Sequence, residues 1–291
     1  MRGIYYYPVL RQLALIALTI CCLSSTWAGD KIVVKGSDTL GAKLMPRLKE
    51  AFKAKKMAEG EAVTFEIAAE GSRTGIMAII EQKADLAMSS REVQLHELLK
   101  ARQSGVQLEQ IPVGVDGIAI IVNENNPLDD LSRREVEMIF TGDIDDWSAL
   151  APISGRISAY TRNTSSGTYS LFQDVALHER DYTRLAQKLA GNEQIASEVA
   201  SNPYAIGYVG LAYSHNPGLK VLKVDGKLPT DRGYPYARPL YFYIDVKKDR
   251  CAMVDEFIAF TLSADGQAVV ESVDFLPVSR IQDVFPGIAG D

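Results

Sequence analysis

Cysteine is almost absent from this chain of 291 residues, and histidine is equally rare. Cys21 and Cys22 lie in the first 28 residues, so only Cys251 remains beyond that segment. A lone cysteine cannot form an internal disulfide, and a large apolar core must therefore hold the fold. We expect Cys251 itself to be a small buried residue. The histidines lie far apart without metal-ligand spacing, and the sequence predicts neither a metal site nor a cofactor.

Signatures of enzymes are missing as well. The sequence has no G-x-S-x-G nucleophile elbow and no G-x-x-x-x-G-K-[ST] phosphate loop. Asp143, Asp145 and Asp146 form an acidic cluster that resembles a weak calcium loop, which we interpret as a solvated turn before Trp147. No catalytic residue is predicted, and we expect a binding protein and not an enzyme.

Long apolar runs are confined to the N-terminus. Residues 1–28 contain Arg2 and Arg11, an apolar stretch at 13–23 and the small residue Ala28 at the predicted cleavage point. This pattern is typical of a secretory signal peptide, and the apolar stretch is too short for a comfortable membrane span. We expect a periplasmic or secreted protein that is not inserted in the membrane after cleavage.

The chain has fewer basic than acidic residues, 31 against 37, which gives a formal net charge of −6. An acidic surface disfavours nucleic acids and anionic membranes as partners. The same field repels a small anion at long range. Any anion site must therefore depend on short-range donors.

Strands and helices alternate along the chain. Apolar stretches at 32–34, 63–68 and 84–88 predict three buried strands, each followed by a helical pattern. More strand–helix units follow a long apolar stretch at 113–123, which predicts an α/β fold with a mostly parallel sheet. No linker separates the units, so we expect two lobes with a ligand cleft between them, joined by two crossing strands near Asp116 and Tyr241. The predicted lobes are residues 29–117 plus 241–291, and residues 118–240.

Three hydroxyl-rich segments that contain glycine each end a predicted strand and begin a predicted helix: 36–39, 71–75 and 164–168. The first N–H groups of a helix have no partner within it, and the helix dipole favours negative charge. Ligands of open α/β sheets bind at these carboxyl ends of strands. Serine and threonine also cap helices, so one such segment alone is a weak indication. Three of them, with Arg162 at the end of a strand, predict a site for one small oxyanion.

The order of the motifs resembles that of the phosphate-binding proteins of bacterial phosphate ABC transporters, most clearly from residue 36 to 210. The block from Arg162 to Thr168 is the most specific of them. The motifs are Gly36-Ser37-Asp38-Thr39-Leu40, Glu70-Gly71-Ser72-Arg73-Thr74-Gly75, Met88-Ser89-Ser90-Arg91, Val115-Asp116-Gly117, Ile139-Phe140-Thr141-Gly142 with Trp147, Arg162 with Ser165-Ser166-Gly167-Thr168, and Ile206-Gly207-Tyr208.

The resemblance implies a periplasmic-binding-protein-like fold that closes around a dehydrated inorganic phosphate. It implies delivery of the phosphate to an inner-membrane ABC permease, and we expect a monomer. Donors from both lobes would surround the anion. The predicted phosphate-binding residues are Thr39, Leu40, Ser72, Arg73, Ser90, Arg91, Arg162, Ser166, Gly167 and Thr168.

The chain departs from the family pattern in the acidic residues of the site. Ser90 stands where many members have an aspartate that accepts the phosphate proton, and Thr164 stands where an acidic partner of the arginine is common. We hypothesise that Asp38 or Asp116 accepts the proton, with Asp38 preferred. The alternative is that Asp38 caps its helix and Asp116 braces the hinge.

Two other functions remain open at this point. One is a binding module for a different oxyanion, or a phosphate sensor without a transporter. The other is a hydrolase of phosphate esters with Ser166 or Thr168 as nucleophile, although the motif lacks a general base or a metal ligand.

Overall fold

The computed structural model describes residues 30–284. The predicted signal peptide, residues 1–28, lies outside the described residues. Within the described part, no helix has the length and apolar character needed to cross a membrane.

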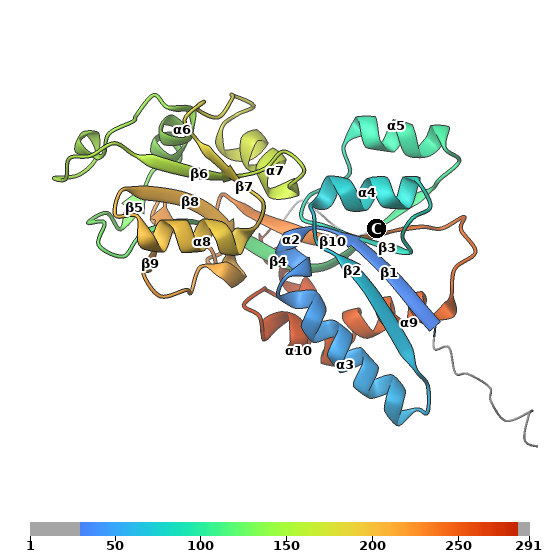
Figure 1. Ribbon diagram of the computed structural model, residues 1–291. Coiled ribbons are helices and arrows are strands. Elements are labelled where there is room, and N and C mark those ends of the chain that lie inside the picture. Colours follow the sequence, from blue (N-terminus) through green and yellow to red (C-terminus); the bar gives the residue numbers. More distant parts are fainter. Residues whose placement is uncertain (1–29, 285–291) are drawn as a thin grey trace, which may run out of the picture.

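A first lobe is built on three strands that carry the motifs around residues 36, 71 and 90 (Figure 1). The strands are β1 (Asp30–Gly36), β2 (Val63–Ala68) and β3 (Leu86–Ser89), and β1 pairs in parallel with both of the others. Helices cover both faces of this sheet (Figure 1). They are α2 (Asp38–Gly41), α3 (Leu44–Ala58), α4 (Ser72–Ile80), α5 (Leu95–Gln103), α9 (Ala252–Leu262), α10 (Ala264–Glu271) and α11 (Ile281–Val284).

A second lobe contains the motif that begins at Arg162, the last residue of its strand. Its strands are β5 (Asp130–Leu131), β6 (Ser158–Arg162), β7 (Gln187–Leu189), β8 (Ala205–Gly210) and β9 (Leu219–Val224), and β6 pairs in parallel with β7 and β8. Its helices are α6 (Arg133–Thr141), α7 (Gly167–Ala176) and α8 (Asn192–Ser201). The described residues also form short 3-10 helices, η1 (Trp147–Ala149) and η2 (Leu211–Tyr213) here and η3 (Val278–Arg280) near the C-terminal end.

Two long antiparallel strands, β4 (Leu108–Asn123) and β10 (Ala237–Asp245), run between the lobes (Figure 1). Residues 108–117 of β4 pair with β10, whereas β4 from Ile118 onward pairs with β8 and β9. The predicted fold class, an α/β fold of two lobes joined by crossing strands, is confirmed, but the sheet is mixed and not mostly parallel, because β4 and β10 pair antiparallel with their neighbours. The residue boundaries of the lobes stay a prediction, since hydrogen-bonded strands continue without a break from β2 to β7.

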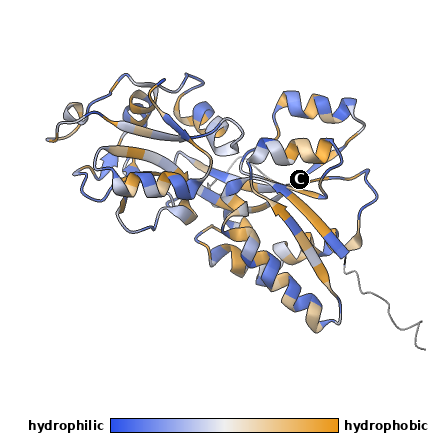
Figure 2. Cartoon of the chain, viewed as in Figure 1, coloured by the Kyte–Doolittle hydropathy of each residue, from blue (hydrophilic) through white to orange (hydrophobic). Residues whose placement is uncertain are grey.

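One apolar cluster extends from the first sheet into the second lobe, where it includes Ile195 and Val209, and another lies within the second lobe. Phe52 and Phe257 pack edge to face beneath the first sheet, and Phe172 stacks on Tyr208 in the second lobe. In Figure 2 the middle of strand β1 is hydrophobic, whereas helix α5 is largely hydrophilic. The expectation that Cys251 is buried is met only in part. The residue is half-buried and is the N-cap of α9, where its Sγ accepts a hydrogen bond from Met253 N.

Lys56, on α3, is buried among three glutamates and forms ion pairs with Glu59, Glu61 and Glu256. Lys55 and Lys56 lower the pKa of Glu59 from 4.5 to about 2. Its contribution to stability is therefore present above pH 4.5 and is lost as the pH falls towards 2. We expect Lys56→Met to lower the unfolding temperature at neutral pH, because the three carboxylates lose their counter-charge. This deficit should shrink as the glutamates are protonated in acid. Thermal unfolding followed by circular dichroism measures it, and a deficit independent of pH would contradict the ion-pair explanation.

Candidate functional site

The starts of α4 and α7 meet where the two lobes touch (Figure 1). A Cβ atom on Gly167 would lie 2.3 Å from Ser72 Oγ and 2.9 Å from Ser90 Oγ. A Cβ atom on Gly71 would lie 2.4 Å from the carbonyl oxygen of Ser165. Both positions therefore require glycine for the close approach of the lobes, and Gly71 also has a positive φ of 127°. The structure is a closed form.

Four buried hydroxyls gather at this contact. Thr39 Oγ1, at the start of α2, lies 3.2 Å from Thr168 Oγ1 of the other lobe. Ser72 Oγ lies 3.2 Å from Ser90 Oγ and accepts a hydrogen bond of 3.0 Å from Ser90 N. The fold thus brings together predicted site residues from four separate motifs.

Ser166, the N-cap of α7, adds a fifth hydroxyl beside them. Its Oγ accepts hydrogen bonds from the backbone N–H groups of Thr168 and Tyr169. Because a hydroxyl has two acceptor lone pairs and one proton, both of its lone pairs are occupied. Its proton is left to donate to another group.

Arg162 is a buried guanidinium with spare donors. Its side chain is 1% exposed, its Nη2 donates to the carbonyl oxygen of Ala190 at 2.7 Å, and its Nη1 lies 3.3 Å from Asp38 Oδ2. Within the described part of the chain, Nε and Nη1 have no hydrogen-bond partner. Burial lowers the pKa of Arg162, and the Asp38 carboxylate opposes this effect. A buried cation with two nitrogens that lack a hydrogen-bond partner is the arrangement expected at an anion site.

Asp38 joins the two lobes. Its Oδ2 accepts hydrogen bonds from Asn192 N at 3.0 Å and from Asn192 Nδ2 at 2.7 Å, at the start of α8. No side-chain hydrogen bond caps α2. Asp38 thus supplies from the first lobe the carboxylate partner for Arg162 that Thr164, at the family position in the second lobe, does not provide.

Arg238, on the crossing strand β10, was missed by the sequence analysis. Its side chain is 2% exposed, and its Nε and Nη2 donate to Asp116 Oδ2 at 3.0 and 2.7 Å. The other oxygen of Asp116 accepts a hydrogen bond of 2.8 Å from Leu211 N. Burial raises the pKa of Asp116, and the Arg238 guanidinium opposes this effect. The available signal was an arginine in a strand that is otherwise mostly apolar and aromatic.

The remaining predicted residues have different surroundings. Arg91 is 5% exposed, and its Nη1 and Nη2 donate to the Glu97 carboxylate at 2.8 and 2.7 Å. Arg73 is exposed, and its backbone N–H donates to Ser165 O at 3.3 Å. Leu40 is fully buried in the core of the first lobe. The contribution of these three residues to binding stays a prediction.

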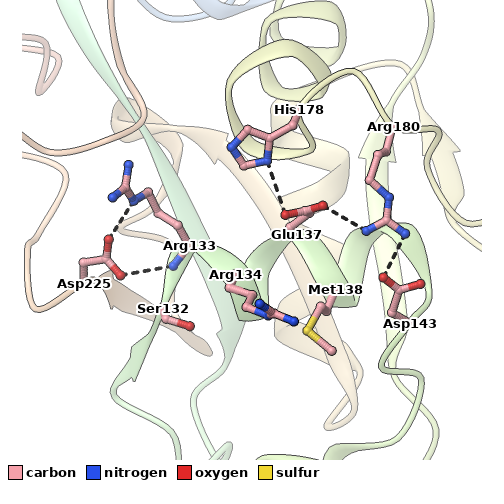
Figure 3. A pocket seen from close by; sticks show the side chains of 9 residues that line it. All are labelled: Ser132, Arg133, Arg134, Glu137, Met138, Asp143, His178, Arg180 and Asp225. Carbon is pink, nitrogen blue, oxygen red and sulfur yellow. Dashed lines mark hydrogen bonds and ion pairs between the residues drawn. The ribbon is translucent and has the colours of Figure 1, made fainter.

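A surface cleft of about 690 Å³ lies apart from this site, on the second lobe beside α6 (Figure 3). None of the predicted site residues lines it. Most of its charged side chains pair with one another, as Arg133 does with Asp225 at 2.7 Å and Arg180 with Glu137 at 2.9 Å. This mutual pairing leaves the cleft without the spare buried donors found around Arg162.

Comparison with known proteins agrees with the geometry. A family model described as a PBP superfamily domain matches residues 24–265. The phosphate-binding protein PstS of Staphylococcus aureus (strain USA300) is 30% identical over 219 residues, which cover 69% of this chain and 66% of that protein. This chain thus matches slightly less than two thirds of the length of that relative.

Solved structures share the fold. One from Clostridium perfringens, described as a phosphate ABC transporter substrate-binding protein with bound phosphate, has a TM-score of 0.76 and 28% identity over 86% of this chain and 100% of its own. An ABC-type phosphate transport receptor from Vibrio cholerae has a TM-score of 0.66 and 23% identity, over 84% of this chain and 99% of its own. The resemblance to phosphate-binding proteins that the motifs predicted is confirmed. The chain belongs to the PBP superfamily, a family of solute-binding proteins.

Proposed function

We propose that this chain binds inorganic phosphate outside the cytoplasm and delivers it to an ABC permease. One observation carries the proposal. The buried Arg162 guanidinium has two nitrogens without a hydrogen-bond partner in the described residues, and it stands in the closed contact between the lobes. The oxygens of a tetrahedral oxyanion would accept hydrogen bonds from these two nitrogens.

The donors at the contact suit an anion that has lost its water. Arg162 offers Nε and Nη1, and Ser166 offers a hydroxyl proton whose oxygen already accepts two N–H groups. The start of α7 adds backbone N–H groups and the favourable end of the helix dipole. Donors of this kind act at short range, so they can hold a divalent anion on a protein of net negative charge.

The relatives support transport as the purpose of binding. The Staphylococcus aureus relative is named a phosphate-binding protein, and the Clostridium perfringens structure is described as the substrate-binding protein of a phosphate ABC transporter. Residues 1–28, with the pattern of a signal peptide, support a periplasmic or secreted location.

The arrangement of the hydroxyls favours binding over ester hydrolysis. A nucleophilic serine or threonine needs a base within hydrogen-bond reach to take its proton. In the described part of the chain, no histidine or carboxylate forms a hydrogen bond with Ser166 or Thr168. We therefore expect no turnover of a phosphomonoester by the purified protein.

Mass spectrometry of the gently purified protein tests the identity of the anion. We expect inorganic phosphate to be carried through purification, at up to one per chain, because both lobes enclose it. Sulfate or an organic anion in its place would contradict the proposal.

Selectivity against sulfate depends, we propose, on Asp38. A carboxylate can accept the proton of HPO4²⁻ but meets sulfate with unrelieved repulsion. Asp38 Oδ2 is engaged by Asn192, whereas Oδ1 receives no hydrogen bond from the described residues. We expect Asp38→Asn to improve sulfate binding relative to phosphate by at least about tenfold.

Asp116→Asn is the matched control, because both carboxylate oxygens of Asp116 already accept hydrogen bonds from Arg238 and Leu211 N. Its phosphate-to-sulfate ratio should stay near the wild-type ratio. Competition titrations with sulfate measure both variants. If sulfate binds to neither variant better than to the wild type, another group, such as Ser90, accepts the hydrogen bond from the phosphate proton.

A further inference from the structure

Arg238, on a crossing strand, donates hydrogen bonds to groups of both lobes. Its Nη1 donates to Thr168 Oγ1 of the second lobe at 2.8 Å and to Ser90 O of the first lobe at 3.2 Å. Its Nη2 lies 3.4 Å from Thr39 Oγ1. Asp116 holds the guanidinium in this orientation through Nε and Nη2.

These contacts determine the direction in which two hydroxyls donate. Arginine has only donors, and a threonine hydroxyl has two acceptor lone pairs and one proton. Thr39 Oγ1 accepts hydrogen bonds from Arg238 Nη2 and from Asn192 Nδ2, each at 3.4 Å. The orientation of the Asn192 amide is fixed because its Oδ1 accepts a hydrogen bond from Gly210 N.

With its lone pairs occupied, Thr39 can only donate. The neighbouring Thr168 Oγ1, 3.2 Å away, then accepts one hydrogen bond from the Thr39 hydroxyl and another from Arg238 Nη1. The lone pairs of Thr168 are occupied in turn, and its proton is left for a ligand oxygen. The threonine pair therefore offers a ligand one proton, from Thr168, and no free lone pair.

The serine pair of the same site is not constrained in this way. Ser90 Oγ has a hydrogen-bond contact with Ser72 Oγ, and no N–H group of the described residues donates to it. Ser90 Oγ is able to accept a proton from a ligand. The serine side of the site can thus accept a hydrogen bond from a protonated phosphate oxygen, whereas the threonine side can only donate to an unprotonated one.

We propose that Arg238 is a positioning residue that makes Thr39 and Thr168 donors only, and so favours HPO4²⁻ over H2PO4⁻. Without Arg238, a lone pair on each threonine is free to accept the additional proton of H2PO4⁻. The inference rests on the proposed function, because it concerns the same phosphate site. It assigns a role in selectivity to a residue that lies outside the recognised motifs.

Arg238→Lys is the decisive variant, because it keeps the positive charge opposite Asp116. A single ammonium group cannot occupy the positions of both Nη atoms and Nε together. Phosphate affinity should be titrated below and above the second pKa of phosphate, with the unfolding temperature measured at each pH. We expect a loss of about tenfold to hundredfold above that pKa and a flatter pH dependence than in the wild type. Unchanged affinity and pH dependence would show that charge alone is needed, and would overturn the inference.

Thr168→Val provides the second arm of a double-mutant cycle. Arg238→Lys should cause less than about threefold further loss in the Thr168→Val background, since the oriented hydroxyl is already gone. Losses that multiply fully would mean that Arg238 acts independently of Thr168, and would also overturn the inference. The neutral double variant Arg238→Gln/Asp116→Asn repeats the test without a buried unpaired charge.

Lys56→Met is the control for the loss of a buried cation elsewhere. It should lower the unfolding temperature and leave phosphate affinity and its pH dependence unchanged. A wild-type chain that does not bind phosphate would refute the proposed function and this inference together. Wild-type binding with an unaltered Arg238→Lys variant would refute the inference alone.

Discussion

Replacing Arg162 with alanine is expected to weaken phosphate binding by about 2–5 kcal/mol, the range for truncating one partner of a buried charge pair. The loss is large because the lost guanidinium is fully enclosed and has two nitrogens without a hydrogen-bond partner in the described residues. The stability of the unliganded protein should change little. Asp38 keeps its hydrogen bonds to Asn192, and the cost of burying one cation near Arg238 is removed.

Isothermal titration of Arg162→Ala with phosphate, together with thermal unfolding in its absence, measures both effects. Arg180→Ala is the matched control, an exposed arginine of the same lobe that pairs with Glu137. We expect the control to bind phosphate as the wild type does. Wild-type affinity of Arg162→Ala would remove Arg162 from the site.

A single methyl group on Gly167 should prevent the lobes from closing. The new Cβ would lie 2.3 Å from Ser72 Oγ and 2.8 Å from Ser72 Cβ, closer than atoms can pack. Overpacking of this kind costs about 1–3 kcal/mol, and we expect Gly167→Ala to bind phosphate roughly tenfold to hundredfold more weakly. The unliganded protein should keep its stability because open lobes leave room for the methyl group.

Small-angle scattering with saturating phosphate shows whether closure is the step that fails. Gly167→Ala should remain more extended than the wild type under the same conditions. Arg180→Ala, away from the contact between the lobes, is again the control and should close as the wild type does. A Gly167→Ala protein that closes and binds normally would show that the contact between Gly167 and Ser72 is not part of the bound form.

Local sequence patterns were sufficient for most of the fold. The strand predicted at 63–68 has these bounds in the structure, and the apolar stretch at 113–123 is the second part of β4. Hydrophobic periodicity and turn residues act between near neighbours, so one sequence is enough to read them. The antiparallel pairing of β10 with both β3 and β4 depends on residues more than a hundred positions apart, and no local pattern specifies it.

The candidate site residues that lie in motifs could be predicted from the sequence. Those that reach the site only through tertiary contacts could not. Ser72, Ser90, Thr39 and Thr168 meet as the motifs indicated. Arg238 reaches them from a strand that has no motif of its own.

The sequence also could not predict which groups the two aspartates of the site, Asp38 and Asp116, pair with. Whether Asp38 caps its helix or pairs across the cleft depends on where α8 begins in space. The structure places Asn192 and Arg162 beside it. A carboxylate that lies one residue from Thr39 in the chain thus acts on the opposite lobe.

The most direct measurement is isothermal titration of the wild-type protein with inorganic phosphate, after unfolding and refolding to remove bound anion. We predict saturable binding at one site per chain, with sulfate unable to compete at equal concentration. Titration in the presence of sulfate separates this selective site from general attraction of anions. Absence of binding at millimolar phosphate, or equal competition by sulfate, would contradict phosphate capture as the function of this chain.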